Sequence, residues 1–156
     1  MSTWSIEFTE TLSVSAPLRE KNLFGKVISM TENGIGTIVI ESAIAVHREL
    51  GPGLLETVYE VALAYELEER GLMVERQVPV RIQYKSISFS EGFRADIIVD
   101  GKVIIELKSV ERVTAAHKKQ VQTYLRLMEC RLGYLLNFGS ALMKDGISRC
   151  VNGLDE

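Results

Sequence analysis

The stretch from Phe93 to Lys108 places charged residues inside strands that are otherwise apolar. It has the pattern of two strands rich in Ile and Val, joined by an Asp-Gly turn at residues 100–101. Asp96 lies inside the first strand, and Glu106 and Lys108 end the second. An ionised group in a buried sheet is costly unless it is paired or holds a metal ion. These three charges therefore predict a partner, and we favour a divalent cation with an attached phosphate.

The length of the turn decides whether the two acids share one face of the sheet. A two-residue turn would send Asp96 and Glu106 to opposite faces. A three-residue loop with Gly101 left-handed pairs Ile98 with Lys102 and makes the acids diagonal neighbours, at roughly 7–8 Å between backbones. We predict the three-residue loop, because it lets both carboxylates bind one hard cation such as Mg²⁺.

The composition is that of a single soluble domain. The 156 residues are 46% hydrophobic and 25% charged, which suits one domain with its own core. The formal net charge of −3 argues against coating nucleic acid by bulk attraction, so any such binding must be confined to a site. Cys130 and Cys150 lack metal-ligand spacing and fit a reducing compartment. Because the chain has no apolar run of membrane-span length and no signal-like N-terminus, we expect a cytoplasmic protein without membrane contact.

Apolar periodicity predicts an α/β domain in the order helix, three-stranded meander, helix, strand. Helical spacing is found over residues 38–50 and 54–70, and the residues alternate over 74–84 as in a half-buried strand. The central strands are apolar on both sides, so helices should cover both faces of a mixed sheet. The other predicted elements are a connection over 86–92, a helix over 114–130, a strand over 132–138, a turn over 144–146 and a last strand over 147–151.

The first thirty residues do not share this pattern. Trp4, Ile6 and Phe8 alternate like a strand, but Ser, Thr and Pro17 interrupt the alternation beyond Phe8. We expect residues 1–30 to be an N-terminal appendage, poorly ordered or not native, and residues 31–156 to form the domain.

The order of the elements and the spacing of the charges resemble the PD-(D/E)XK nuclease superfamily. Its signature has the form Asp96-x9-Glu106-x-Lys108 in this sequence, with Ala95 where the superfamily often has proline. The resemblance covers about residues 30–153. It implies a restriction-endonuclease-like core, which is the element order predicted above.

Two further motifs narrow the resemblance. The residues from Gln120 to Tyr124 are similar to the QxxxY motif of the exonuclease branch of that superfamily. The residues Gly53, Glu56 and Tyr59 have the spacing of the motif that names the GxxExxY family. The chain therefore resembles the GxxExxY family in particular.

The resemblance implies metal-dependent hydrolysis of a phosphodiester bond in nucleic acid, with DNA favoured over RNA. Glu56, Asp96 and Glu106 would be the ligands of Mg²⁺ or Mn²⁺. Lys108 would be the fourth catalytic residue and would orient the attacking water or stabilise charge on the phosphate. The supporting residues would be Gln120, Tyr124, His117 and Tyr59. Whether two chains form a homodimer to cut both strands stays open.

Structural interpretations compete with these roles. An acid such as Glu56 is common in the first turn of a helix, where the helix dipole favours negative charge. The strand charges could form an ion-pair cluster instead of a metal site. Gln120, Tyr124 and His117 lie on an otherwise apolar helix side and could be packed core residues.

Two other functions stay open as well. The first is a catalytically inactive nuclease-fold module that binds nucleic acid or a partner protein, because fold similarity alone does not exclude it. The second is a metal-dependent phosphohydrolase that acts on a small nucleotide. The complete set of three acids with Lys108 favours a nuclease over the inactive module, because a degenerate site would be expected to have lost one of those charges.

Overall fold

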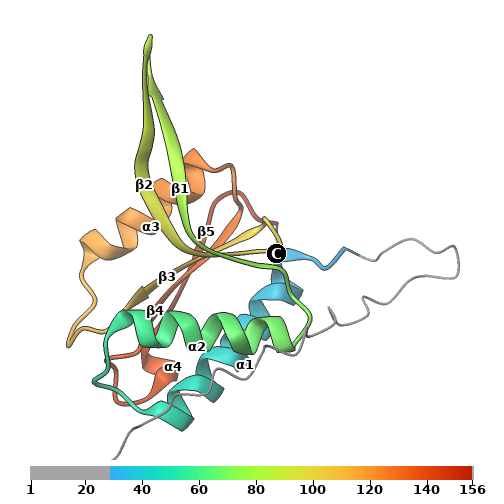
Figure 1. The fold of residues 1–156 in the computed structure, drawn as a ribbon, viewed down its shortest axis with the longest axis vertical. Helices are drawn as coiled ribbons and strands as arrows, with labels where there is room; N and C mark the ends of the chain where they lie inside the picture. The colour runs from blue at the N-terminus through green and yellow to red at the C-terminus, as the bar shows by residue number, and fades with distance from the viewer. Residues whose placement is uncertain (1–28, 156) are drawn as a thin grey trace, which may run out of the picture.

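The computed structural model describes residues 29–155, which form a mixed five-stranded sheet with helices on both faces (Figure 1). The strands lie across the sheet in sequence order, and of the neighbouring pairs β3 and β4 run parallel while the others are antiparallel. The predicted element order and mixed sheet are confirmed. The strands are β1 (Val74–Tyr84), β2 (Ile87–Val99), β3 (Val103–Lys108), β4 (Leu132–Asn137) and β5 (Ile147–Val151).

Each face of the sheet has its own apolar core. Helices α1 (Glu32–Leu50) and α2 (Glu56–Glu69) pack on one face, where Ile97, Ile105 and Leu107 are fully or almost fully buried. Helix α3 (Ala115–Leu127) packs on the other face, against Ile98 and Ile104 among others. Alternate residues of the central strands therefore serve opposite cores, as expected for strands that are apolar on both sides.

Most helix and strand ends lie within three residues of the prediction, and three elements differ more clearly. Helix α1 begins earlier than residue 38, because the Thr31 hydroxyl accepts a hydrogen bond from the backbone of Gly34 and caps it. Residues 87–92 belong to β2 rather than to a connection, because the chain reverses tightly at Lys85, whose φ is 53°. The predicted turn over 144–146 lies in the short helix α4 (Met143–Gly146).

The Asp-Gly turn is anchored by a residue from another part of the sheet. Asp100 and Gly101 both have positive φ, at 51° and 66°, and the backbone N–H of Lys102 donates to the carbonyl of Val99. The backbone N–H of Asp100 donates to the carbonyl of Met73, and its carboxylate accepts from the N–H of Met73. These two bonds fix Asp100 as the first residue of the loop.

The predicted register of the hairpin is wrong, but Asp96 and Glu106 are still neighbours. Ile98 pairs with Ile104 rather than with Lys102, so the three-residue loop lies one position later in the chain than predicted. The left-handed Gly101 is confirmed. The ladder ends at Ile97, one residue before Asp96. Asp96 still lies close enough to Glu106 for its negative charge to raise the pKa of that residue.

Two sequence expectations concern the chain as a whole. No helix in residues 29–155 is both long enough and apolar enough to span a membrane. The predicted N-terminal appendage lies outside the described residues, apart from its last two.

Candidate active site

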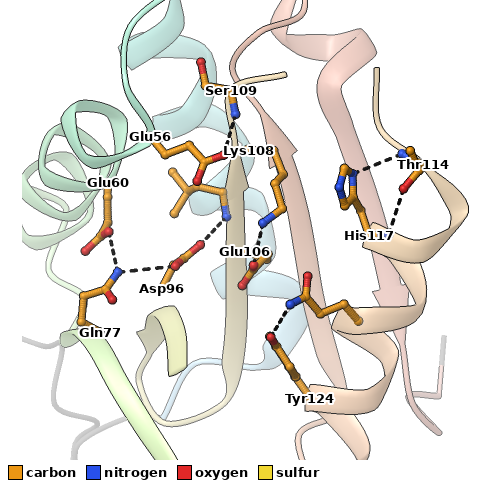
Figure 2. Close-up of polar contacts among 12 residues, drawn as sticks. Glu56, Glu60, Gln77, Asp96, Glu106, Lys108, Ser109, Thr114, His117 and Tyr124 are labelled. Carbon is orange, nitrogen blue, oxygen red and sulfur yellow. Dashed lines mark hydrogen bonds and ion pairs between the residues drawn. The ribbon is translucent and has the colours of Figure 1, made fainter. Parts of the chain in front are cut away.

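Asp96 lies where the ladder between β2 and β3 ends. Backbone pairing of these strands runs from Val99 to Ile97 and includes no residue before it. Beyond that point the backbone N–H of Leu107 donates to Oδ2 of Asp96 at 2.8 Å. The Asp96 carboxylate therefore takes the place that a strand carbonyl would otherwise have, and this bond holds it against β3 (Figure 2).

Glu106 is buried, and its two carboxylate oxygens differ in their hydrogen bonding. Only 5% of the residue is exposed. Its Oε1 accepts a hydrogen bond from Nζ of Lys108 at 3.0 Å, whereas Oε2 is buried and has no hydrogen-bond partner among the described residues. Leaving a buried polar atom unsatisfied costs about 1–3 kcal/mol, and more for a charged group. This oxygen is available to a ligand that the protein itself does not supply.

The environment of the two acids disfavours negative charge. Burial, reinforced by the negative charge of Asp96, raises the pKa of Glu106 to about 7. Burial also raises the pKa of Asp96, although its bond from Leu107 works in the opposite direction. A cation placed between two such carboxylates would relieve their repulsion.

Lys108 is the cationic group of the site. Burial by itself would lower the pKa of its ammonium group, but the bond to Glu106 and the nearby carboxylates outweigh this effect and raise it. Lys108 is therefore protonated at neutral pH. Its positive charge compensates only part of the acidic charge around it.

Tyr59 holds the loop that leads into α2. The residue is fully buried, its ring stacks on Phe138, and its hydroxyl donates to the carbonyl of Gly51 at 2.6 Å. The same hydroxyl accepts from the backbone N–H of Leu54 at 3.1 Å. The structure therefore gives Tyr59 a role in shaping the loop, with Gly53 adopting a φ of 100°.

Glu56 comes from the start of α2 and reaches the strand that ends in Lys108. Its Oε1 accepts from the backbone N–H of Ser109 at 3.2 Å, while the Ser109 hydroxyl donates to the carbonyl of Leu54 at 2.6 Å. Figure 2 shows Glu56 beside Lys108 and Ser109. The negative charge of Glu56 contributes to the raised pKa values of Asp96 and Glu106, so the three acids share one electrostatic environment.

A second layer of polar residues lies behind Asp96, and sequence reasoning missed it. Glu60 is buried, and its two oxygens accept from Nε of Arg76 at 2.9 Å and from Nε2 of Gln77 at 2.7 Å. The same Gln77 amide donates to Oδ1 of Asp96 at 3.4 Å. Gln77 has a φ of 52°, which is uncommon for a residue with a side chain. This backbone conformation accompanies an amide that bridges Glu60 and Asp96 (Figure 2).

One signal for this layer is present in the sequence. Glu60 follows Glu56 by one helical turn, so both acids lie on the same side of α2. Nothing in the sequence indicates the left-handed backbone of Gln77, because its neighbours alternate like those of an ordinary strand.

The structure separates the predicted supporting residues of α3 into two groups. The Gln120 amide donates to the hydroxyl of Tyr124, whose ring stacks on Phe93 with centroids 3.8 Å apart. Burial and then the charge of Glu106 raise the pKa of Tyr124, which places its hydroxyl in the field of the acids. His117 instead forms a capping box with Thr114, accepting that residue's N–H at its Nδ1. The contacts of His117 explain the start of α3 rather than a role at the acids.

The carboxylates of the site are suitable ligands for a divalent cation, but they do not form a complete coordination shell. Within residues 29–155, no three His, Cys, Asp or Glu side chains are grouped so as to hold a metal ion. Asp96 and Glu106 converge, whereas Glu56 is bound to Ser109. Carboxylate oxygens are the ligands that Mg²⁺ and Mn²⁺ prefer. The unpartnered Oε2 of Glu106 is the observation that best fits such an ion.

An apolar groove lies away from the candidate active site. It has a volume of about 890 Å³, lies between α1 and α2, and is lined by Val58, Val61 and Tyr65 among others. None of the acids described above lines it.

Comparisons with known proteins were made against family models, curated proteins and solved structures. The model of the PD-(D/E)XK nuclease superfamily matches residues 33–150. This range includes all the predicted site residues as well as Glu60 and Gln77. No curated protein and no solved structure gives a match.

Proposed function

The chain belongs to the PD-(D/E)XK nuclease superfamily, and on this premise we propose that it is a metal-dependent nuclease that hydrolyses phosphodiester bonds, with DNA as its substrate. The restriction-endonuclease-like arrangement of sheet and helices agrees with this family. The motif Gly53, Glu56 and Tyr59 supports a place in the GxxExxY group. The observation that carries the proposal is the closeness of Asp96 to Glu106, whose buried Oε2 has no hydrogen-bond partner in residues 29–155.

Asp96 and Glu106 would hold Mg²⁺ or Mn²⁺, and Glu56 would add a third carboxylate from α2. When bound, such an ion lowers the pKa of a coordinated water and neutralises charge on the phosphate. Superfamily members generally use divalent ions, which supports this choice of cofactor.

The chain's own residues would position the substrate and control charge. Lys108, protonated and fixed by its bond to Glu106, would stabilise negative charge developing on the phosphate. The Gln77 amide would keep Asp96 oriented through its bond to Oδ1. Gln120 and Tyr124 would line the side of the site formed by α3.

The test compares the wild-type protein with the variant Asp96→Ala. Both would be incubated with linear duplex DNA, circular DNA, single-stranded DNA and RNA, each in Mg²⁺, Mn²⁺ or EDTA. We expect metal-dependent cleavage by the wild type and a rate lower by at least about 100-fold in the variant, equivalent to about 2.7 kcal/mol of transition-state stabilisation. The control is Glu49→Ala, an exposed acid on α1. Cleavage that is equal in both variants, or that persists in EDTA, would contradict the proposal.

One observation favours the alternative of an inactive binding module. The absence of a preformed group of three ligands in residues 29–155 is what a site without metal would show. This alternative predicts nucleic-acid binding by wild type and by Asp96→Ala with equal affinity, and no cleavage by either in any metal.

A further inference from the structure

The outer part of the β1–β2 hairpin extends beyond the rest of the sheet (Figure 1). We name residues 79–94 the arm. Along the arm β1 pairs only with β2, and β2 has no pairing there with β3. Nearly all of its side chains from residue 81 to residue 92 are exposed. Because an isolated two-stranded ribbon is only marginally stable in water, an exposed ribbon of this length indicates a binding partner.

The two faces of the arm differ in chemistry. The strands pair the polar residues Gln83 and Ser88, and they pair the apolar residues Tyr84 and Ile87. One face of the arm is therefore polar and the other is apolar. Lys85 lies at the tip, with its ammonium group over the ring of Tyr84 at 5.4 Å. The apolar face carries Ile82, Tyr84, Ile87 and Phe89, and the polar face carries Arg81, Gln83, Ser88 and Ser90.

The arm is basic in a chain that is acidic overall. It contains Arg81, Lys85 and Arg94 against the single acid Glu91, while the whole chain has a net charge of −3. Arg94 is paired with Glu91 at 2.7 Å. Within residues 29–155, Arg81 and Lys85 form no ion pair, so their charge is available to an anionic partner.

We propose that the arm lies in the major groove of duplex DNA whose scissile strand is bound at the acids. This inference rests on the proposed function and deepens it by naming the groove of the DNA duplex that the arm would occupy. The major groove of B-DNA is about 12 Å wide and admits a two-stranded ribbon, whereas that of duplex RNA is too narrow. Arg, Gln and Ser, the residues of the polar face, are side chains that bond to base edges and phosphates.

The arm and Asp96 are parts of the same strand, β2. Ile87 at the tip and Asp96 at the foot are nine residues apart in β2, which corresponds to about 30 Å of extended chain. At about 3.4 Å per base pair, the tip then lies about nine base pairs from the scissile phosphate. An 8-base-pair duplex that is bound at the acids therefore ends before it reaches the tip.

The test measures DNA binding by the full chain in EDTA, where metal-dependent cleavage does not occur. The arm variant carries Arg81→Ala and Lys85→Ala together. The control carries Arg48→Ala and Lys144→Ala, which remove the same charge from exposed positions near the loop after α1 and in α4. Affinities for labelled duplexes of 8 and 24 base pairs are read from fluorescence anisotropy at several salt concentrations.

We expect the arm variant to bind the 24-base-pair duplex at least about 10-fold more weakly than the control, with a salt slope smaller by about 2. Its affinity for the 8-base-pair duplex should equal that of the control. Urea unfolding of both proteins shows whether the arm variant is folded as the wild type is. Equal affinities of the two variants for the long duplex would overturn the inference.

Two further outcomes would also overturn it. An equal loss of affinity for a single-stranded 24-mer would exclude binding in a duplex groove. A change in sedimentation mass without a change in affinity would identify the arm as a contact between two copies of the chain. The cleavage assay tests the proposed function separately. If the arm variant binds DNA more weakly but the wild type does not cleave, the arm inference stands and the nuclease proposal fails. If the wild type cleaves but the arm variant binds DNA as well as the control does, the nuclease proposal stands and the arm inference fails.

Discussion

Glu106 keeps a carboxyl group in surroundings that favour its neutral form. The folded protein binds a proton there up to about pH 7, while the unfolded chain releases it near the ordinary value of 4.5. Between these two values the folded state holds more protons than the unfolded state, so its stability falls as the pH rises. The raised pKa of Glu106 lowers the free energy of unfolding at pH 8 by at most roughly 3 kcal/mol relative to its value below pH 4.5.

The variant Glu106→Gln should therefore lose most of this pH dependence. The free energy of unfolding, measured with urea in EDTA from pH 5 to pH 8, should fall with rising pH in the wild type and should change less in the variant. Asp96, whose pKa is raised in the same direction, accounts for part of what remains. The control Glu49→Gln, at an exposed position, should keep the wild-type slope. An unchanged slope in Glu106→Gln would contradict the assignment of the raised pKa to this residue.

Gln77 offers a test of how Asp96 is oriented. Asn also tolerates a left-handed backbone, but its side chain is one methylene too short to bridge Glu60 and Asp96. We expect Gln77→Asn to bind Mn²⁺ about 10-fold more weakly, as for other partners that orient metal ligands. Binding is measured by isothermal titration, with Gln83→Asn in the same strand as the control. Wild-type affinity in Gln77→Asn would show that the bond at 3.4 Å does not orient Asp96.

The residues of the site differ in how far the sequence could predict them. The closeness of Asp96, Glu106 and Lys108 could be predicted, because a charge within an apolar strand has few explanations. Gln77 was not predictable, because its role depends on a left-handed backbone that a strand pattern does not reveal. The three predicted acids do share one environment, but the bond of Glu56 to Ser109 depends on a loop conformation that spacing cannot give.

At the scale of elements, the entry into α2 depends on one hydroxyl group. Removing it in Tyr59→Phe leaves the carbonyl of Gly51 and the N–H of Leu54 without their partner. We expect a loss of about 1–3 kcal/mol in the free energy of unfolding, measured with urea. The cleavage rate should also fall, because Glu56 follows this loop directly. Tyr65→Phe, at a ring that is 61% exposed, is the matched control and should change neither quantity.

Helix α3 begins with a capping box that includes His117. Gln can take the same position in a capping box, so His117→Gln should keep the stability within about 0.5 kcal/mol. The cleavage rate should stay within about twofold of the wild type, because the imidazole serves the cap. Thr114→Ala should instead lower the free energy of unfolding by about 1 kcal/mol. A much slower His117→Gln enzyme would show that the ring takes part in catalysis.

The central hairpin shows what a short sequence signal can and cannot establish. The Asp-Gly pair correctly predicted the turn, and the left-handed glycine followed from its chemistry. The predicted pairing of Ile98 was wrong by two residues, and the loop lies one position later, because Met73, far away in the chain, anchors Asp100. The two acids nevertheless meet, since a shift by an even number of residues leaves side chains on the same face.

At the scale of the whole molecule, the proposed metal ion would stabilise the folded protein, because it would relieve the repulsion between Asp96 and Glu106. An ion that binds the folded state alone stabilises it by about 2.7 kcal/mol at 100 times its dissociation constant. We expect Mn²⁺ at that excess to raise the free energy of unfolding of the wild type by this amount, measured with urea at pH 7.5. Asp96→Ala should gain much less from the same addition. An equal gain in both proteins would place the ion elsewhere.

The order of the strands also determines when the sheet can form during synthesis on the ribosome. β3, which carries Glu106 and Lys108, can pair with β2 at once, but its parallel neighbour β4 begins about two dozen residues later. At 5–20 residues per second, a ribosome needs roughly one to five seconds to deliver it. During that interval the nascent chain already carries Glu56, Asp96 and Glu106, yet the apolar edge of β3 is unpaired and accessible to chaperones. The proposed active site would be supported by a complete sheet only after β4 and β5 have left the exit tunnel.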